Sequence, residues 1–327
     1  MAMRSLLRLA TAGLIAAGLA SPAWAQWPDR PIKLISPFPP GGQVGTLAYT
    51  IAQRLGPLIG QPVVMEPRPG AAGSIAASFV AKAPKDGYTL LFGTSSMLGV
   101  AKYTYANLPY DPVTDFAPVT YVGNVTVGVF ASLQSGITTV EQLLAQARAQ
   151  PGKLNFGSPG IGSASHLAGE LFQQQAGIRL MHVPYPSNTA QMTDLVNGQT
   201  QLSFSGAASG HLYSKEGRTR FVAVAAPRRV PQYPDVPALG EFLKGYEAPA
   251  WLGIVAPAGT PADIVNRLHD GISKVLANPE LQPLFDAQAL DRGDPMSPAA
   301  FGDKIQREMV LWEKAVRASG MQVEGRK

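Results

Sequence analysis

The sequence predicts an α/β protein made of two lobes. Strand-like and helix-like runs alternate along the chain, an order that favours parallel strands joined by right-handed crossovers. Two such sets follow one another, and the second begins near residue 120. A last strand and two helices close the chain, and these helices could complete the first lobe. The chain would then cross between the lobes twice.

The first set predicts three strands and two helices. Apolar runs bounded by Gly and Pro indicate the strands, at residues 31–38, 62–67 and 88–96. A run of small residues indicates a helix over 73–83. The helix expected over 44–59 has one apolar face, made by Leu47, Ile51, Leu55 and Leu58.

The second set predicts five strands and four helices by the same signals. The strands are expected at residues 119–132, 153–158, 179–185, 200–206 and 219–226. Three helices are expected at residues 138–150, 189–197 and 207–215, and a further helix-like pattern follows the glycines and serines of the stretch 156–172.

A return strand over 248–259 leads into the last two helices. Thr260-Pro261 and Ser297-Pro298 each combine an N-cap residue with Pro at the first helical position. They predict helices that run to about residues 277 and 319.

The first 25 residues have the pattern of a secretory signal peptide. Arg4 and Arg8 precede an apolar stretch, and Ala23-Trp24-Ala25 has the small-x-small form of a cleavage site. The apolar stretch is shorter than the roughly 20 residues of a membrane span. We therefore expect cleavage before Gln26 and export to the periplasm.

Composition gives no support to nucleic-acid binding. Without residues 1–25 the chain carries 27 − 2 = 25 basic and 22 acidic residues, a net charge of +3. Its longest basic run is Arg228-Arg229. There is no cysteine, so no disulfide holds the fold.

Three loops rich in Gly, Pro and Ser follow predicted strands. Their sequences are PFPPGG, GTSS and, in the second lobe, GSPGIGSASH. Ligands of open α/β sheets bind in the crevice at the carboxyl ends of the strands. Helix N-termini there favour negative charge by about 0.3–1 kcal/mol each. We therefore expect a small anion between the lobes.

A nucleotide phosphate fits this crevice poorly. Gly157 and Gly162 have the spacing of a phosphate-binding loop, but Ser163 and Ala164 stand at its Lys and Ser/Thr positions. Ser165 replaces the third Gly of a dinucleotide fingerprint. That these glycines only form a tight turn stays open as an alternative.

Several segments resemble the solute receptors of tripartite tricarboxylate transporters, the Bug family. They are WPDRPIKLISPFPPGG, GQPVVMEPRPGAAG, DGYTLLFGTSS, LPYDPVTDFAPV, PGKLNFGSPGIGSASHLAGELF, HVPY and YPDVPALGE. The resemblance runs from Trp27 to about Gly320. It implies the periplasmic-binding-protein or flytrap architecture, with two Rossmann-like lobes joined by crossing strands. Lobe 1 would comprise residues 26–123 and 251–327, and lobe 2 residues 124–250.

The resemblance also implies a function. A receptor of this kind binds a small carboxylate between the lobes and delivers it to integral membrane transporter subunits. It implies no catalysis, no metal and no cofactor, and we expect a monomer.

Carried over position by position, the resemblance places ligand-binding residues in the loops of both lobes. They are Phe38, Pro39, Gly41, Gly42, Thr94, Ser95, Ser96, Ser158, Gly162, Ser163, His166, Tyr185, Ser187, Thr189 and Ser205. The chain departs from the family pattern in two places. Val44-Gly45 stands where Thr-Asp is common, and Ser205 stands where Asp is common. Since an ammonium group needs a paired acid, we expect an amine-free di- or tricarboxylate, or an aromatic carboxylate such as terephthalate.

Two other functions stay open. A hydrolase of a small ester could use Ser158 as nucleophile and His166 as base. A receptor could also present its closed form to a sensor protein. His166 and Ser163 have a second interpretation as local helix-start residues, and Trp251 one as interlobe packing.

Overall fold

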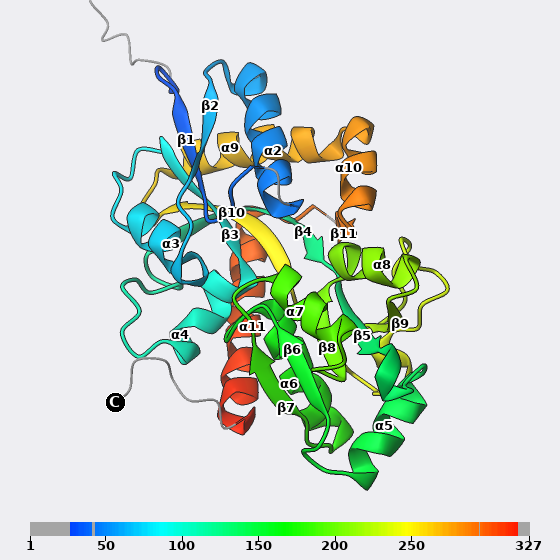
Figure 1. Cartoon of the computed structure of the whole chain (residues 1–327). Coiled ribbons are helices and arrows are strands. Elements are labelled where there is room, and N and C mark those ends of the chain that lie inside the picture. Colours follow the sequence, from blue (N-terminus) through cyan, green and yellow to red (C-terminus); the bar gives the residue numbers. More distant parts are fainter. Residues whose placement is uncertain (1–26, 41–42, 294, 320–327) are drawn as a thin grey trace, which may run out of the picture.

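The computed structural model of the chain describes residues 27–40, 43–293 and 295–319, and they form two sheets with helices on both faces (Figure 1). The predicted signal peptide at residues 1–25 lies outside the described residues. Within those ranges no helix has the length and apolar character needed to cross a bilayer.

The first sheet has six strands in the order β11-β4-β10-β3-β1-β2. The bounds are β1 (Ile32–Ser36), β2 (Val63–Pro67), β3 (Thr89–Thr94), β4 (Phe116–Val125), β10 (Trp251–Pro257) and β11 (Leu290–Asp291). Its helices are α2 (Gln43–Ile59), α3 (Ser74–Ala81), α4 (Ala101–Thr104), α9 (Ala262–Ala277), α10 (Gln282–Ala287) and α11 (Pro298–Ser319). Apolar residues of α2 and α9 pack on one face of this sheet, and those of α3 and α11 on the other.

The second sheet has five strands in the order β7-β6-β8-β5-β9. The bounds are β5 (Val127–Ser132), β6 (Asn155–Ser158), β7 (Met181–Pro184), β8 (Leu202–Gly206) and β9 (Thr219–Val224). Its helices are α5 (Val140–Ala149), α6 (Ala164–Ala176), α7 (Asn188–Val196) and α8 (Ala207–Lys215). The first two pack on one face around Phe156 and Phe172, and Phe130 packs with Met192 and Leu195 of α7 on the other.

The prediction of parallel sheets is only partly right. β1 pairs in parallel with β2 and β3, and β6 with β7 and β8. However, β10 runs antiparallel to β3 and β4, and β5 runs antiparallel to β8 and β9. Both sheets are mixed because these strands enter from the other lobe rather than through a helical crossover.

Other local expectations also need correction. The strand-like run 119–132 is two strands, β4 and β5, that belong to different sheets. Leu58 is exposed and Ile59 is buried, so the buried face continues four residues after Leu55 and not three. Thr260 does not cap α9; its hydroxyl donates to the carbonyl of Pro257. The helical segment from Ser96 to Thr104 was not predicted.

Helix α11 contacts both lobes. Its first half packs under the first sheet through Phe301, Ile305 and Met309. Its second half packs on the core of the second sheet through Trp312 and Val316, and the helix lies beside α6 (Figure 1). The N-cap expected at Ser297 is confirmed, since its Oγ accepts the N–H of Ala300 at 3.2 Å.

Trp312 should be the most costly position of α11 to truncate. It is 1% exposed and lies in the core of the second sheet, so Trp312→Ala should lower the free energy of unfolding by about 3–5 kcal/mol. Urea denaturation measures this. The matched change Val310→Ala, on the same helix but 56% exposed, should stay within about 0.5 kcal/mol of the parent. Equal losses in both variants would contradict the packing described.

Candidate functional site between the lobes

The candidate site lies where loops of the two sheets meet. Gly162, in the loop after β6, contacts Thr104 at the end of α4; a Cβ at Gly162 would lie 3.3 Å from Thr104 Oγ1. The backbone of Gly162 has a φ of +75°, a region that glycine adopts without strain. Helices α6, α7 and α8 all begin directly after carboxyl ends of strands or the loops that follow them. Their first N–H groups therefore gather at the edge where an anion is expected.

The first loop is held by local hydrogen bonds between Ser36 and Phe38. Ser36 Oγ accepts the N–H of Phe38 at 3.1 Å and donates to the Phe38 carbonyl at 3.0 Å. The Phe38 side chain is half-buried and Pro39 is exposed, while Gly41 and Gly42 lie outside the described residues. A Cβ at Gly45 would sit 1.9 Å from the Pro39 carbonyl oxygen. The loop therefore occupies the space that an Asp at position 45 would need.

The loop after β3 connects the site to the first lobe. Thr94 Oγ1 accepts the N–H of Met97 at 3.3 Å. Ser95 is buried, and its Oγ accepts the N–H of Trp251 at 3.4 Å. Ser96 begins a π-helical turn that continues into α4, and such turns are frequent at functional sites.

Trp251 packs in the interior of the first lobe. Its ring lies edge-on to Phe301, and its Nε1 donates to Glu308. Lys304 Nζ contacts the other carboxylate oxygen of Glu308 at 2.6 Å. Burial raises the pKa of Glu308 although both partners favour its charged form. These contacts keep the Trp251 side chain in the first lobe's core.

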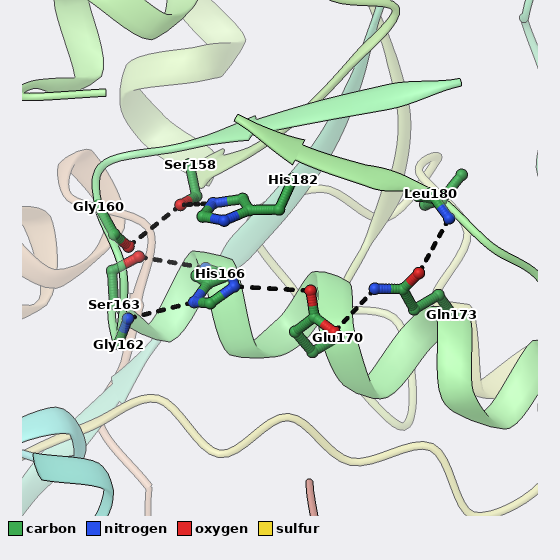
Figure 2. A network of polar contacts seen from close by, with 9 residues as sticks. All are labelled: Ser158, Gly160, Gly162, Ser163, His166, Glu170, Gln173, Leu180 and His182. Atoms are coloured by element: carbon green, nitrogen blue, oxygen red, sulfur yellow. Dashed lines mark hydrogen bonds and ion pairs between the residues drawn. The ribbon is translucent and has the colours of Figure 1, made fainter. Parts of the chain in front are cut away.

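The loop after β6 is organised by His166 (Figure 2). The His166 Nδ1 accepts the N–H of Gly162 at 3.1 Å, so this nitrogen carries no proton. The other ring nitrogen, Nε2, faces Glu170 Oε1 at 3.5 Å. Ser163 caps α6, because its Oγ accepts the N–H of His166 at 3.1 Å. Both ring nitrogens of His166 thus serve the loop and helix, and the ligand contact expected for this side chain finds no support here.

A second histidine lies under the same loop. The rings of His166 and His182 stack with centroids 3.8 Å apart, and Phe156 packs against both. His182 Nε2 lies 2.7 Å from Ser158 Oγ, which also donates to the Gly160 carbonyl at 3.1 Å. Burial, with a smaller effect of His166, lowers the pKa of His182 to about 3. His182 is therefore neutral, and with Ser158 donating to Gly160 its Nε2–H points at Ser158.

This geometry does not make a nucleophile. Ser158 is fully buried and contacts His182, not the base His166 that the hydrolase alternative requires. A general base works best with a pKa near the working pH, far above that of His182. The Ser158 hydroxyl is hydrogen-bonded to the Gly160 carbonyl and to His182 inside the lobe. Its side chain therefore stabilises the loop and is not placed to attack a substrate.

The starts of α7 and α8 form a neutral polar edge. Ser187 caps α7 by accepting the N–H of Ala190 at 3.2 Å, and Thr189 is exposed in the first turn. Ser205 is buried and donates to Asn188 Oδ1 at 3.3 Å; Asn188 in turn donates to Ser209 at 3.5 Å. The sequence interpretation missed Asn188 and Ser209. The only signal was a Ser-Asn-Thr run at the helix start.

Two side chains set the position of these elements. Tyr185 OH donates to Asp194 Oδ2 at 2.9 Å, and burial together with this bond raises the pKa of Tyr185 to about 12. The buried Gln191 amide donates to the carbonyls of Gly157 and Phe204 at 2.9 and 2.8 Å. It thereby ties β6 to β8 where both strands end.

Of the predicted residues, the structure gathers Ser158, Gly162, Ser163 and His166 in one cluster. Ser187, Thr189 and Ser205 belong to a second cluster at α7 and α8. The residues of the first lobe lie in the loops after β1 and β3. Among the described residues no group of three or more His, Asp or Glu could hold a metal ion.

Comparison with known proteins agrees with this architecture. Residues 47–316 match the family described as the tripartite tricarboxylate transporter family receptor. The chain belongs to this receptor family. BugT of Bordetella pertussis is 32% identical to it, with 99% of this chain and 100% of BugT covered.

The chain is also similar in structure to solved periplasmic binding proteins. Rpa4515 of R. palustris, solved with adipate, has a TM-score of 0.80 and 32% identity, and the match covers 90% of this chain and 99% of Rpa4515. MatC of Rhodopseudomonas palustris, solved with bound malate, has a TM-score of 0.76 and 29% identity, over 89% of this chain and 100% of MatC. The receptor therefore has the two-lobe fold of a periplasmic binding protein.

The buried His182 should make the receptor less stable in mild acid. Its pKa is about 3 in the folded state and 6.5 ordinarily, so between these values the unfolded chain binds the extra proton. Stability should be full above pH 6.5 and fall as the pH falls towards 3. Thermal unfolding across this range measures the slope.

The variant His182→Gln should flatten that slope. His269→Gln serves as the control, since His269 lies on α9 in the other lobe and contacts only the Val119 carbonyl among the bonds described. A slope that His182→Gln leaves unchanged would refute the assignment of the acid sensitivity to His182.

Proposed function

We propose that the protein is an exported solute receptor that binds an amine-free carboxylate between its lobes and delivers it to a tripartite transporter. Membership of the receptor family supports the first part, and the relatives solved with adipate and with malate support a carboxylate ligand. The proposed lobes are residues 26–123 with 251–327, and residues 124–250.

The neutral edge at α7 and α8 carries the proposal about ligand chemistry. Ser205, Asn188 and Ser209 present hydroxyl and amide groups where a carboxylate would be needed to hold an ammonium ion. The two acids that contact other proposed ligand-binding residues, Glu170 and Asp194, already accept hydrogen bonds within the protein. Glu170 faces His166 and accepts from Gln173, and Asp194 accepts from Tyr185. The helix N-termini and Ser caps remain to bind negative charge.

Calorimetry with matched acids tests this ligand class. Malate and aspartate differ only in a hydroxyl and an ammonium group, and the dicarboxylates adipate and terephthalate extend the comparison. At least one amine-free acid should bind. Its amino counterpart should bind at least about a hundredfold more weakly, because an unpaired buried charge costs about 3 kcal/mol or more.

Two results would count against this proposal. Aspartate that binds as tightly as malate would overturn the argument from the neutral edge. If no carboxylate binds, the receptor function itself is wrong. Turnover of a chromogenic ester would instead favour the hydrolase alternative.

Export should remove the first 25 residues. The signal-peptide pattern ends at Ala25, so protein recovered from the periplasm should begin at Gln26. Intact-mass measurement checks this directly, and light scattering of the same sample should give the mass of one chain. Periplasmic protein that retains Met1 would exclude the proposed cleavage.

A further inference from the structure

A second hollow lies on the first lobe, outside the candidate site. It is a groove of about 810 Å³ lined by α3, by Lys33 near the start of β1, by Arg68 just after β2, and by residues 105–109. Ile75, Phe79 and Leu108 give it an apolar floor. None of the residues proposed to bind the carboxylate lines it.

The rim of this groove is cationic. Lys33, Arg68 and Lys82 line it, and its described lining contains no Asp or Glu. Glu66 contacts Lys33 at 3.2 Å and Arg68 at 2.6 Å, so one acid is shared by two cations. Lys82 is exposed and has no ion pair within the described ranges. The rim therefore carries an excess of positive charge that an acidic partner would complement.

The floor has the features of a protein-binding surface. The Arg68 guanidinium lies 3.7 Å above the centre of the Phe79 ring, and arginine with aromatic residues is the composition enriched at interface centres. Ile75 is 51% exposed, a large apolar side chain left in solvent. A small-molecule pocket would enclose most of its ligand, whereas this groove is more open than enclosed.

One wall of the groove, formed by residues 105–109, follows in sequence from Thr104, the residue that contacts the second lobe. The segment that starts at Ser96 runs through α4 to Thr104, where it meets Gly162 of the second lobe. Residues 105, 107, 108 and 109 of the groove wall follow directly. The wall therefore adjoins the contact between the lobes in sequence, and its Leu108 packs with Phe79 of α3 on the same core of the first lobe.

We propose that this groove docks an acidic segment with apolar side chains from an integral subunit of the transporter. The proposal rests on the proposed receptor function and adds the surface through which the receptor meets its partner. Apolar side chains of the segment cover Ile75 and Phe79, and its acids pair with Lys82 and the Arg68–Lys33 rim.

Site-specific cross-linking in the strain that encodes the protein tests this docking. A photoreactive phenylalanine analogue replaces Ser78, which lines the groove. It should cross-link to a multi-span subunit of a tripartite transporter, identified by mass spectrometry. The pair Ile75→Glu with Lys82→Glu should lower this yield about tenfold or more.

The matched control lies on a different helix. Val310→Glu with Lys314→Glu on α11 changes one exposed apolar residue and one exposed lysine in the same way, and it should leave the yield unchanged. Calorimetry with malate and adipate should show that both variant pairs keep the parent's affinity. Lys82→Glu alone provides a milder variant should the pair unfold.

The other possible results of the cross-linking and the calorimetry separate the docking inference from the receptor function. Cross-links only to a second copy of the chain, only to lipid, or to nothing overturn the docking inference, as does an equal loss in the α11 control. If malate, adipate and terephthalate all fail to bind, the receptor function fails independently of the cross-link. If a carboxylate binds and Ser78 captures no transporter subunit, only the docking inference fails.

Discussion

The hydrogen bond from the Val125 N–H to the Ala250 carbonyl, 2.6 Å long, joins the two segments by which the chain passes between its lobes. It continues the antiparallel pairing of β4 with β10, in which Trp251 lies opposite Asn124. Because both crossings sit side by side in the first sheet, the lobes share one narrow connection on this side. The loops after β3 and β6 can then meet through Thr104 and Gly162.

Helix α11 adds a second constraint on the same pair of lobes. Phe301 belongs to a core of the first sheet and Trp312 to the core of the second, so one rigid helix is packed into both. Gly99 allows this approach, since a Cβ there would lie 3.1 Å from the Trp312 ring. Any change in the angle between the lobes must therefore shift the side chains that pack against α11 in at least one lobe. This links the π-helical turn after β3 to the position of the second lobe.

The sequence predicted the elements whose signals are local. The caps at Ser163 and Ser297, and the α2 face through Leu47, Ile51 and Leu55, depend on neighbours within a few turns. Two errors, at Leu58 and at the Thr260 cap, are local, and the others have long-range causes. The break at Thr126 exists because β4 and β5 pair with different partners, and the segment from Ser96 to Thr104 packs against α11. For the candidate site, the Gly- and Ser-rich loops are visible in the sequence. The contact of Ser158 with His182 in place of His166 is not visible there, because it requires the pairing of β6 with β7.

The departures at Gly45 and Ser205 have a common physical consequence. At Gly45 the missing side chain lets the Pro39 carbonyl fold onto the start of α2, so the backbone of the first loop fills the place of an acid. At Ser205 the hydroxyl is taken up by Asn188, which satisfies a buried group without introducing charge. Neither position carries the acid that the family resemblance suggests: at Gly45 the backbone of the loop fills the space, and at Ser205 the hydroxyl is held by a hydrogen bond. The edge at α7 and α8 combines helix N-termini with the neutral groups of Ser205, Asn188 and Ser209, a combination that favours an anion over a cation.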